Sequence, residues 1–153
     1  PSIVGELLKN LELKIGTVES CTAGKLASLI TSISGSSNYY MGSLLTYSDP
    51  LKIKLAKVSD ASIQEFGSVS EQVATEMAVG GKNQLGVDVC ISTTGIAGPT
   101  GGSEEKPVGL VWVAIAIKEK VITRKFQFSP HRERNIQMTS LSALNLLRNA
   151  LKD

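Results

Sequence analysis

Three side chains in this sequence have types and spacing that could support nucleophilic chemistry. Ser20 follows an apolar run and precedes a helical pattern, so its hydroxyl would lie at a turn between a strand and a helix. Backbone N–H groups at a helix start are unpaired and attract an anion or a developing oxyanion. An alcohol needs a base to remove its proton. Lys52 could be that base in its neutral form, and Tyr47 could orient or relay the proton.

Each of these side chains also has a purely structural interpretation. A serine before a helix often caps it, a lysine on an amphipathic helix is commonly a solvated charge, and Tyr47 could be a packing residue. Cys21 is a rival nucleophile at the same helix start, or a small buried residue. His131 is the only histidine, so a Ser-His-Asp arrangement would have to use it, but the sequence favours a surface residue at the start of the last helix over a general base. The residues alone indicate a site without identifying its reaction.

Composition narrows the class of protein. The 153 residues are 42% hydrophobic and carry a net charge of +2, which predicts a single domain over residues 1–153. One histidine excludes a site with several imidazole ligands, and no CxxC or HExxH spacing indicates zinc, so we expect no metal. The small charge and the 5% aromatic content argue against a nucleic-acid partner and favour a small anion.

The sequence also predicts in which compartment of the cell the protein lies. No segment approaches the roughly 20 apolar residues that a membrane helix requires, because the longest apolar run, Leu110 to Ile117, has the length of a strand. The first residues lack the basic start and long apolar stretch of a signal peptide. Cys21 and Cys90 are expected to be reduced thiols. We therefore expect a cytoplasmic protein with no membrane partner.

Hydrophobic periodicity predicts interleaved helices and strands. Helices are expected at residues 3–11, at 26–33 with Thr22 as cap, at 50–57, at 73–85 with Ser70 as cap, and from about 130 to 151. Strands are expected at 14–18, 39–47, 87–92, 108–117 and 121–128. The last two are joined by a short connection and form an antiparallel hairpin. The pattern predicts an α/β fold, a three-layer α/β/α sandwich around a mixed, mainly parallel sheet.

Parallel strands would bring three polar loops to one edge of this sheet. These loops follow the strands that end near Val18, Thr46 and Ile91, and the carboxyl ends of parallel strands lie together. The third loop, residues 94–102, is too rich in glycine to be a helix or strand, and it matches neither a Walker A nor a GxGxxG pattern. The topology therefore places the serine, the tyrosine and the lysine beside a glycine-rich loop.

The sequences of these loops resemble the CinA carboxy-terminal domain family. The matching stretches run in order along nearly the whole chain: ESCTAG (19–24), SGSS (34–37), YSD (47–49), GSVSE (67–71), TGIAGP (94–99) and EKPVG (105–109). That family includes the bacterial nicotinamide mononucleotide deamidases. The resemblance implies hydrolysis of the carboxamide of this phosphorylated nucleotide to nicotinic acid mononucleotide and ammonia, with no cofactor. It also implies a homodimer or larger homo-oligomer.

The resemblance further implies roles for individual residues. Ser20 would be the nucleophile, Lys52 the general base and Tyr47 its assistant. Asp49 stands where the family commonly has asparagine, and a carboxylate near the lysine would favour the charged amine unless the two side chains point apart. Two alternatives remain: a nucleotide-binding or regulatory domain without turnover, and an amidohydrolase for another small amide. The residues expected to bind substrate are Thr22, Ser37, Thr94, Gly95, Gly98 and, for the phosphate, Arg132.

Overall fold

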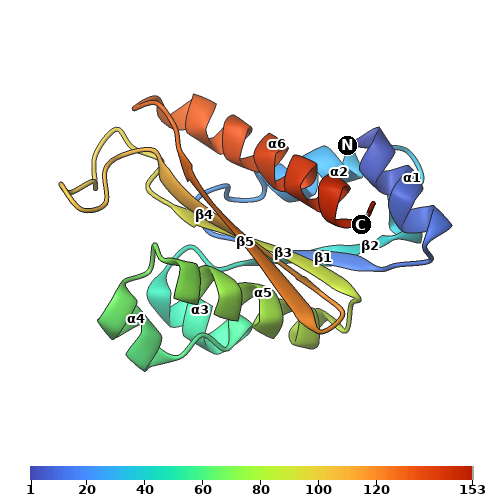
Figure 1. Ribbon diagram of the computed structural model, residues 1–153, viewed down its shortest axis with the longest axis horizontal. Helices are drawn as coiled ribbons and strands as arrows, with labels where there is room; N and C mark the ends of the chain where they lie inside the picture. The colour runs from blue at the N-terminus through green and yellow to red at the C-terminus, as the bar shows by residue number, and fades with distance from the viewer. Residues whose placement is uncertain (153) are drawn as a thin grey trace.

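A computed structural model describes residues 1–152, in which one five-stranded sheet lies between two layers of helices (Figure 1). The elements, in chain order, are α1 (Ser2–Asn10), β1 (Ile15–Glu19), α2 (Lys25–Thr31), the 3-10 helix η1 (Ser36–Asn38), β2 (Tyr40–Leu45), α3 (Asp49–Ala56), α4 (Asp60–Phe66), α5 (Glu71–Leu85), β3 (Val89–Gly95), β4 (Leu110–Ile117), β5 (Lys120–Gln127) and α6 (Arg132–Ala150).

The sheet is mixed, and most of its strands share one direction. Its strand order is β2-β1-β3-β4-β5. β1 pairs in parallel with β2 and β3, whereas β4 is antiparallel to both β3 and β5. Helices α1, α2 and α6 cover one face, and α3, α4 and α5 cover the other (Figure 1). This arrangement confirms the predicted three-layer sandwich and the antiparallel hairpin.

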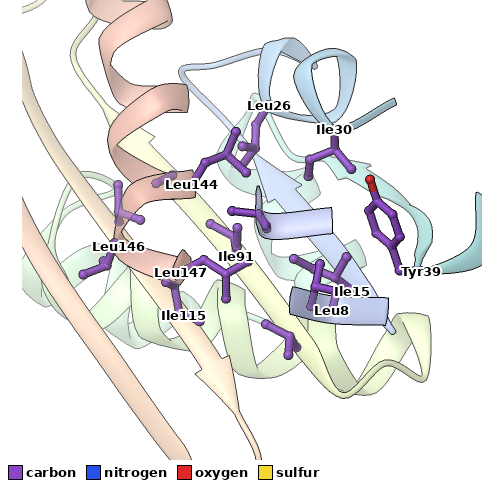
Figure 2. Packing of buried hydrophobic residues seen from close by; sticks show 14 of the residues in the cluster. Leu8, Ile15, Leu26, Ile30, Tyr39, Ile91, Ile115, Leu144, Leu146 and Leu147 are labelled. Carbon is purple, nitrogen blue, oxygen red and sulfur yellow. The ribbon is translucent and has the colours of Figure 1, made fainter. Parts of the chain in front are cut away.

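Each face of the sheet has its own apolar core. On the side of α1, α2 and α6, the strands contribute Ile15, Ile91 and Ile115, and the helices contribute Leu8 of α1 and Leu144 and Leu147 of α6 (Figure 2). A separate cluster on the other face joins β1 to the helices through Val18, Ala56, Val73, Met77 and Cys90. Burial of large side chains on both faces is typical of a mainly parallel sheet between two layers of helices.

Two adjacent glycines allow α5 to pack closely against its neighbours. A Cβ atom on Gly80 would lie 1.6 Å from the carbonyl oxygen of Ala56, at the end of α3. A Cβ atom on Gly81 would lie 2.1 Å from Cγ2 of Val18. Glycine lowers helix propensity, but here only a hydrogen atom fits. Gly80 therefore allows α5 to pack closely against α3, and Gly81 allows it to pack closely against the sheet.

Side chains of β1 alternate between the two helical layers, and this sets the direction of the residues that follow. Ile15 belongs to the core on the α6 side, whereas Val18 belongs to the core on the α5 side. With a period of two residues, Glu19 faces the same side as Ile15 and Ser20 the same side as Val18. The strand therefore directs Glu19 towards α2 and Ser20 towards the layer that contains α3.

Of the two predicted helix caps, one is confirmed and the other is wrong. The hydroxyl of Ser70 caps α5 by accepting a hydrogen bond from the N–H of Val73. Thr22 does not cap α2, which begins at Lys25 after Gly24 in a left-handed conformation. The sequence analysis missed α4, because a helix of seven residues is too short to show a clear period.

Two further findings concern the cysteines and the helices. Cys21 and Cys90 are both free and buried. Among residues 1–152, no helix combines the length and the apolar character needed to cross a membrane.

Candidate active site

The carboxyl ends of β1, β2 and β3 meet at one edge of the sheet, as the sequence predicts. The N–H of Ser20 donates to the carbonyl of Thr93 at 3.0 Å, which joins the end of β1 to β3. The N–H of Thr46 donates to the carbonyl of Glu19 at 2.9 Å, which joins the end of β2 to β1. The three polar loops therefore begin side by side.

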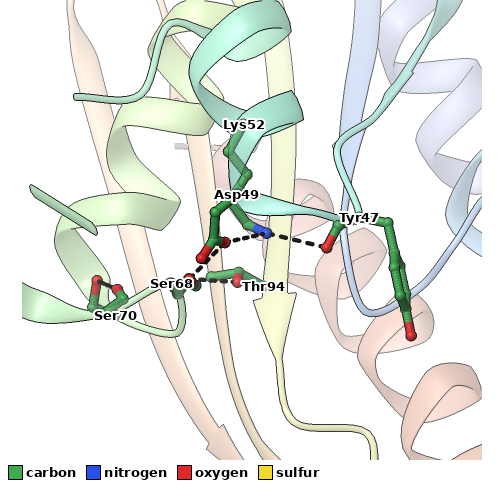
Figure 3. A network of polar contacts seen from close by, with 7 residues as sticks. Tyr47, Asp49, Lys52, Ser68, Ser70 and Thr94 are labelled. Atoms are coloured by element: carbon green, nitrogen blue, oxygen red, sulfur yellow. Dashed lines mark hydrogen bonds and ion pairs between the residues drawn. The ribbon is translucent and has the colours of Figure 1, made fainter. Parts of the chain in front are cut away.

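Lys52 is buried at this edge rather than solvated. Its side chain rises from the first half of α3, after Pro50 in the first turn, and is only 2% exposed. The Nζ atom donates to the carbonyl oxygen of Tyr47 at 3.4 Å and lies 3.3 Å from Oδ1 of Asp49 (Figure 3). Both contacts are long, and an ammonium group has three donors. The amine thus keeps hydrogen-bonding capacity for another group.

The carboxylate beside this amine is itself held by the opposite side of the site. Asp49 Oδ1 accepts a hydrogen bond from the hydroxyl of Ser68 at 2.6 Å, and Thr94 donates to the carbonyl of Ser68 at 2.7 Å (Figure 3). Asp49 and Lys52 therefore do not point apart. The network joins α3, the α4–α5 loop and the end of β3, so it fixes the lysine relative to the sheet.

Ser20 presents an unbonded hydroxyl at the end of β1. The residue is largely buried, and its Oγ has no hydrogen-bond partner within residues 1–152. Its carbonyl accepts from the N–H of Ala23 at 3.1 Å, which closes a tight turn. Within residues 1–152, the N–H groups of Cys21 and Thr22 donate to no backbone carbonyl. The turn therefore offers one hydroxyl and two amide donors.

The start of α2 is occupied by a side chain, contrary to the expectation that its N–H groups are free. Glu19 is fully buried, and its carboxylate accepts from the N–H groups of Gly24 (2.9 Å), Leu26 (3.1 Å) and Ala27 (2.8 Å). A carboxylate is stabilised at the positive end of a helix dipole. The expectation was wrong for the helix itself, and the free donors lie in the preceding turn.

Thr22 has a different position from the one expected. Its side chain is buried, donates to Oε2 of Glu19 at 2.7 Å and shares a hydrogen bond of 2.8 Å with the hydroxyl of Thr93. A side chain with both bonds inside the protein does not reach a ligand. Only the backbone N–H of Thr22 remains available, so its predicted contact to substrate through the side chain is not supported.

Cys21 is unsuited to be the nucleophile. Burial raises the pKa of its thiol to about 12, and the negative charge of Glu19 acts in the same direction. Its side chain packs in the apolar core on the α6 side of the sheet. The thiol is therefore neutral at physiological pH, and a neutral thiol is a poor nucleophile.

Tyr47 and Arg132 lie together at the open side of the site. Tyr47 is 60% exposed, and its phenol oxygen accepts from Nη2 of Arg132 at 3.1 Å. Nη1 of Arg132 donates to the carbonyl of Gly98 at 2.9 Å. The phenol of Tyr47 was expected beside Lys52, but only its carbonyl oxygen is there (Figure 3). The exposed guanidinium next to the glycine-rich loop is placed to meet an anion.

The glycine-rich loop packs against its own chain. Gly98 has φ +86, and a Cβ atom there would lie 2.4 Å from Cγ1 of Val108. A Cβ atom on Gly95 would lie 2.6 Å from Cγ2 of Val111. The amide of Asn135 in α6 holds the loop by donating to the carbonyl of Ala97 at 2.9 Å. Close packing against Val108 and Val111 explains both glycines, so their presence in the sequence is no evidence of a bound ligand.

Two other expected candidates lie outside this constellation. Ser37 belongs to η1, directly before β2, and Tyr40 at the start of β2 pairs with Ile15 at the start of β1. Ser37 therefore lies at the amino edge of the sheet, opposite Ser20, and a single chain does not bring the two together. His131 is exposed at the start of α6 and takes no part in the hydrogen bonds described above.

Comparison with known proteins identifies the family. Residues 1–151 match the family model of the CinA C-terminal domain. The chain belongs to this family. A CinA-like protein from Cytophaga hutchinsonii is 46% identical over 150 residues, which cover 98% of this chain and 36% of that protein. A putative competence-damage inducible protein from Caldicellulosiruptor saccharolyticus is 42% identical over 149 residues, 97% of this chain and 36% of that protein. The CinA-family chain thus spans about a third of the length of these relatives.

Solved structures of CinA superfamily proteins share the fold. The competence/damage inducible protein from Agrobacterium tumefaciens superposes with a TM-score of 0.92 at 34% identity, covering 100% of this chain and 98% of that one. A CinA superfamily protein from Klebsiella pneumoniae gives 0.95 at 28% identity, covering 98% and 94%.

Two residues of this CinA-family site had no role assigned from the sequence. Ser68 holds Asp49, and Glu19 holds the start of α2. Both lie in stretches that resemble the family, and this resemblance was the only feature of the sequence that could have pointed to them. Neither has a local pattern that indicates its partner, because the partners are on other elements.

Proposed function

We propose that this CinA-family domain hydrolyses the carboxamide of nicotinamide mononucleotide to give nicotinic acid mononucleotide and ammonia. One observation carries the chemistry: the buried amine of Lys52 lies at the same sheet edge as the unbonded hydroxyl of Ser20. A serine and a lysine in a partly desolvated site can act as nucleophile and base. The choice of substrate rests on the resemblance of the surrounding loops to the family.

In the first half of the reaction, Ser20 Oγ attacks the carboxamide carbon. The neutral amine of Lys52 takes the hydroxyl proton, a C–O bond forms, and the carbonyl electron pair moves onto oxygen. The N–H groups of Cys21 and Thr22 receive this oxyanion, since both lack an acceptor within residues 1–152. The amide donors lie in the same turn as the nucleophile, so no movement of α2 is needed.

In the second half, the oxyanion re-forms the carbonyl and the C–N bond breaks. Lys52 gives its proton to the leaving nitrogen, which departs as ammonia and leaves an acyl ester on Ser20. A water molecule then attacks the ester, Lys52 accepts one of its protons, and that proton returns to the serine oxygen as the acid is released. One water is consumed for each ammonia produced.

The open side of the site supports binding of a phosphorylated substrate. Arg132 offers an exposed guanidinium, which binds phosphate well because its donors are planar and permanently charged. Tyr47 connects this group to the base, because its phenol accepts from Arg132 and its carbonyl accepts from Lys52. Tyr47 therefore assists the lysine by positioning. Thr94, through its bond to Ser68, supports the opposite wall.

Incubating the purified domain with nicotinamide mononucleotide tests the proposal. We expect one ammonia per nucleotide consumed, in the presence of a chelator, with nicotinic acid mononucleotide identified by chromatography. The Asp49–Lys52 ion pair favours a second candidate, a nucleotide-binding domain without turnover, because Asp49 already engages the amine that would have to take the serine proton. Binding by calorimetry without ammonia release would support this second candidate and contradict the first.

We also propose that the domain is a homodimer formed through the β2 edge. Residues 39–48, which contain β2, have no charged side chain, whereas the opposite edge strand β5 carries three basic ones. Met41 and Leu45 on β2 are exposed. An uncharged, apolar edge strand pairs readily with another strand. Antiparallel pairing of two β2 strands about a two-fold axis would place the loop with Ser37 of a second copy near the carboxyl end of β2.

Substitution of Leu45 by aspartate tests this interface. We expect the parent protein to have the mass of a dimer by light scattering, and Leu45→Asp to have the mass of a monomer, because a charge would be buried in the pairing. Val121→Asp on the β5 edge is the matched control and is expected to remain dimeric. A monomeric parent protein, or an unchanged dimer for Leu45→Asp, would contradict the proposed interface.

A further inference from the structure

We infer that Glu19 is a positioning residue for the nucleophile. Its buried carboxylate fixes the turn between β1 and α2, so that the Ser20 hydroxyl and the N–H groups of Cys21 and Thr22 are held as one unit. The inference rests on the proposed function, because it requires Ser20 to be the attacking group.

The buried carboxylate of Glu19 accepts hydrogen bonds from the residues around it. It is 0% exposed, and within residues 1–152 no basic side chain forms an ion pair with it. Carboxylates are seldom fully buried unless their oxygens are bonded. Here three backbone N–H groups at the start of α2 donate to it, at 2.8–3.1 Å. The helix start therefore depends on this one side chain.

Hydroxyl groups extend the same network across the sheet. Thr22 donates to Oε2 at 2.7 Å, and Thr17 donates to Oε1 at 3.4 Å. Thr22 also bonds to Thr93 of β3, and Thr17 bonds to Tyr40 of β2 at 2.8 Å. The carboxylate is thus linked to all three strands whose loops form the site.

The geometry of the turn explains why such fixing is needed. Residue 24, at the N-cap of α2, is a glycine and has no side chain to cap the helix. Ala23 has φ +46, a conformation that residues with a side chain seldom adopt. The four residues 20–23 are held at one end by the strand pairing of Glu19 and at the other by its carboxylate. The backbone bonds from Ala23 to Ser20 and from Lys25 to Thr22 close the turn locally, and the carboxylate joins it to the first turn of α2.

Glu19→Gln tests this role because it preserves size and replaces one acceptor oxygen with a donor that faces other donors. We expect kcat to fall by about tenfold or more, because small displacements of reacting groups are costly. KM should stay within about twofold, because no contact to substrate is removed. A fluorophosphonate that labels Ser20 should react more slowly by a similar factor but reach the same final labelled fraction. Thr22→Val, which removes one hydroxyl donor to Glu19, should change the same quantities less.

Controls separate positioning from loss of fold. Leu147→Ala removes a buried core side chain on α6 and should lower Tm without slowing the labelling of folded protein. Normal kcat per labelled Ser20 in Glu19→Gln would overturn the inference, as would a rise in KM at unchanged kcat. If Glu19→Gln does not fold, Thr22→Val is tested instead. A fall in its kcat and in its rate of Ser20 labelling would support the inference, and parent values of both would contradict it.

The labelling experiment also distinguishes the two proposals. If the parent protein labels at Ser20 but releases no ammonia, the proposed substrate is wrong, and the labelling rates still test Glu19. If the parent protein labels no more than Ser20→Ala does, the nucleophile assignment and the inference about Glu19 both fall.

Discussion

Replacing Ser20 with alanine is expected to reduce ammonia release from nicotinamide mononucleotide by about 10⁴-fold or more, because removal of a covalent nucleophile leaves only binding and oxyanion stabilisation. The substitution removes a hydroxyl that has no hydrogen bond within residues 1–152, so the melting temperature should change little. Circular dichroism and thermal unfolding would check the fold, and a coupled ammonia assay would check the rate.

Cys21→Ala is the matched control for this prediction. Its thiol has a pKa raised to about 12 by burial, so it stays protonated up to well above neutral pH and contributes no thiolate. We expect turnover within a few-fold of the parent protein, and resistance to iodoacetamide at pH 8. The serine assignment would be wrong if Ser20→Ala were active and Cys21→Ala were not.

Replacing Lys52 with methionine is expected to lower kcat by about 10³-fold, a loss typical of a missing general base. Methionine matches the aliphatic part of the lysine and suits the buried site, so the fold should persist. The rate should be measured at saturating substrate, since the loss is expected in kcat rather than in KM. Retention of more than about a tenth of the parent rate would contradict the role of Lys52 as base.

Asp49→Asn provides the companion experiment. The carboxylate lies 3.3 Å from the lysine amine and forms an ion pair with it, whereas asparagine removes that charge and retains an oxygen that can accept from Ser68. We expect Asp49→Asn to be faster than the parent protein at saturating substrate, because the amine of Lys52 no longer forms an ion pair. A loss as large as that of Lys52→Met would instead make the carboxylate part of the base.

The sequence predicts well which loops form this site, because the direction of the strands determines which loops meet at one edge of the sheet. Once β1, β2 and β3 are taken as parallel, their following loops must share an edge, and Ser20 and Lys52 follow from that. The same reasoning places a loop that precedes β2 at the opposite edge. The expectation that Ser37 lies with Ser20 in one chain therefore conflicts with the predicted topology itself.

Other features depend on side-chain directions that periodicity does not determine. Tyr47 lies just beyond β2, where the alternation of strand side chains no longer applies, and its phenol pairs with Arg132 from the far end of the chain. Glu19 caps a helix from the preceding strand, a contact across a turn whose shape depends on that contact. Such mutual dependence is invisible in a pattern of apolar and polar residues.

The contact of Gly80 with Ala56 has a consequence for how this domain can change over generations. Residue 80 touches no reacting group, yet a methyl group there would lie 1.6 Å from the carbonyl oxygen that ends α3, the helix that carries Lys52. A chemically inert position would then be under the same selection as the lysine itself. Variation at residue 80 should be as rare among active homologues as variation at the base, although nothing about glycine suggests a catalytic role.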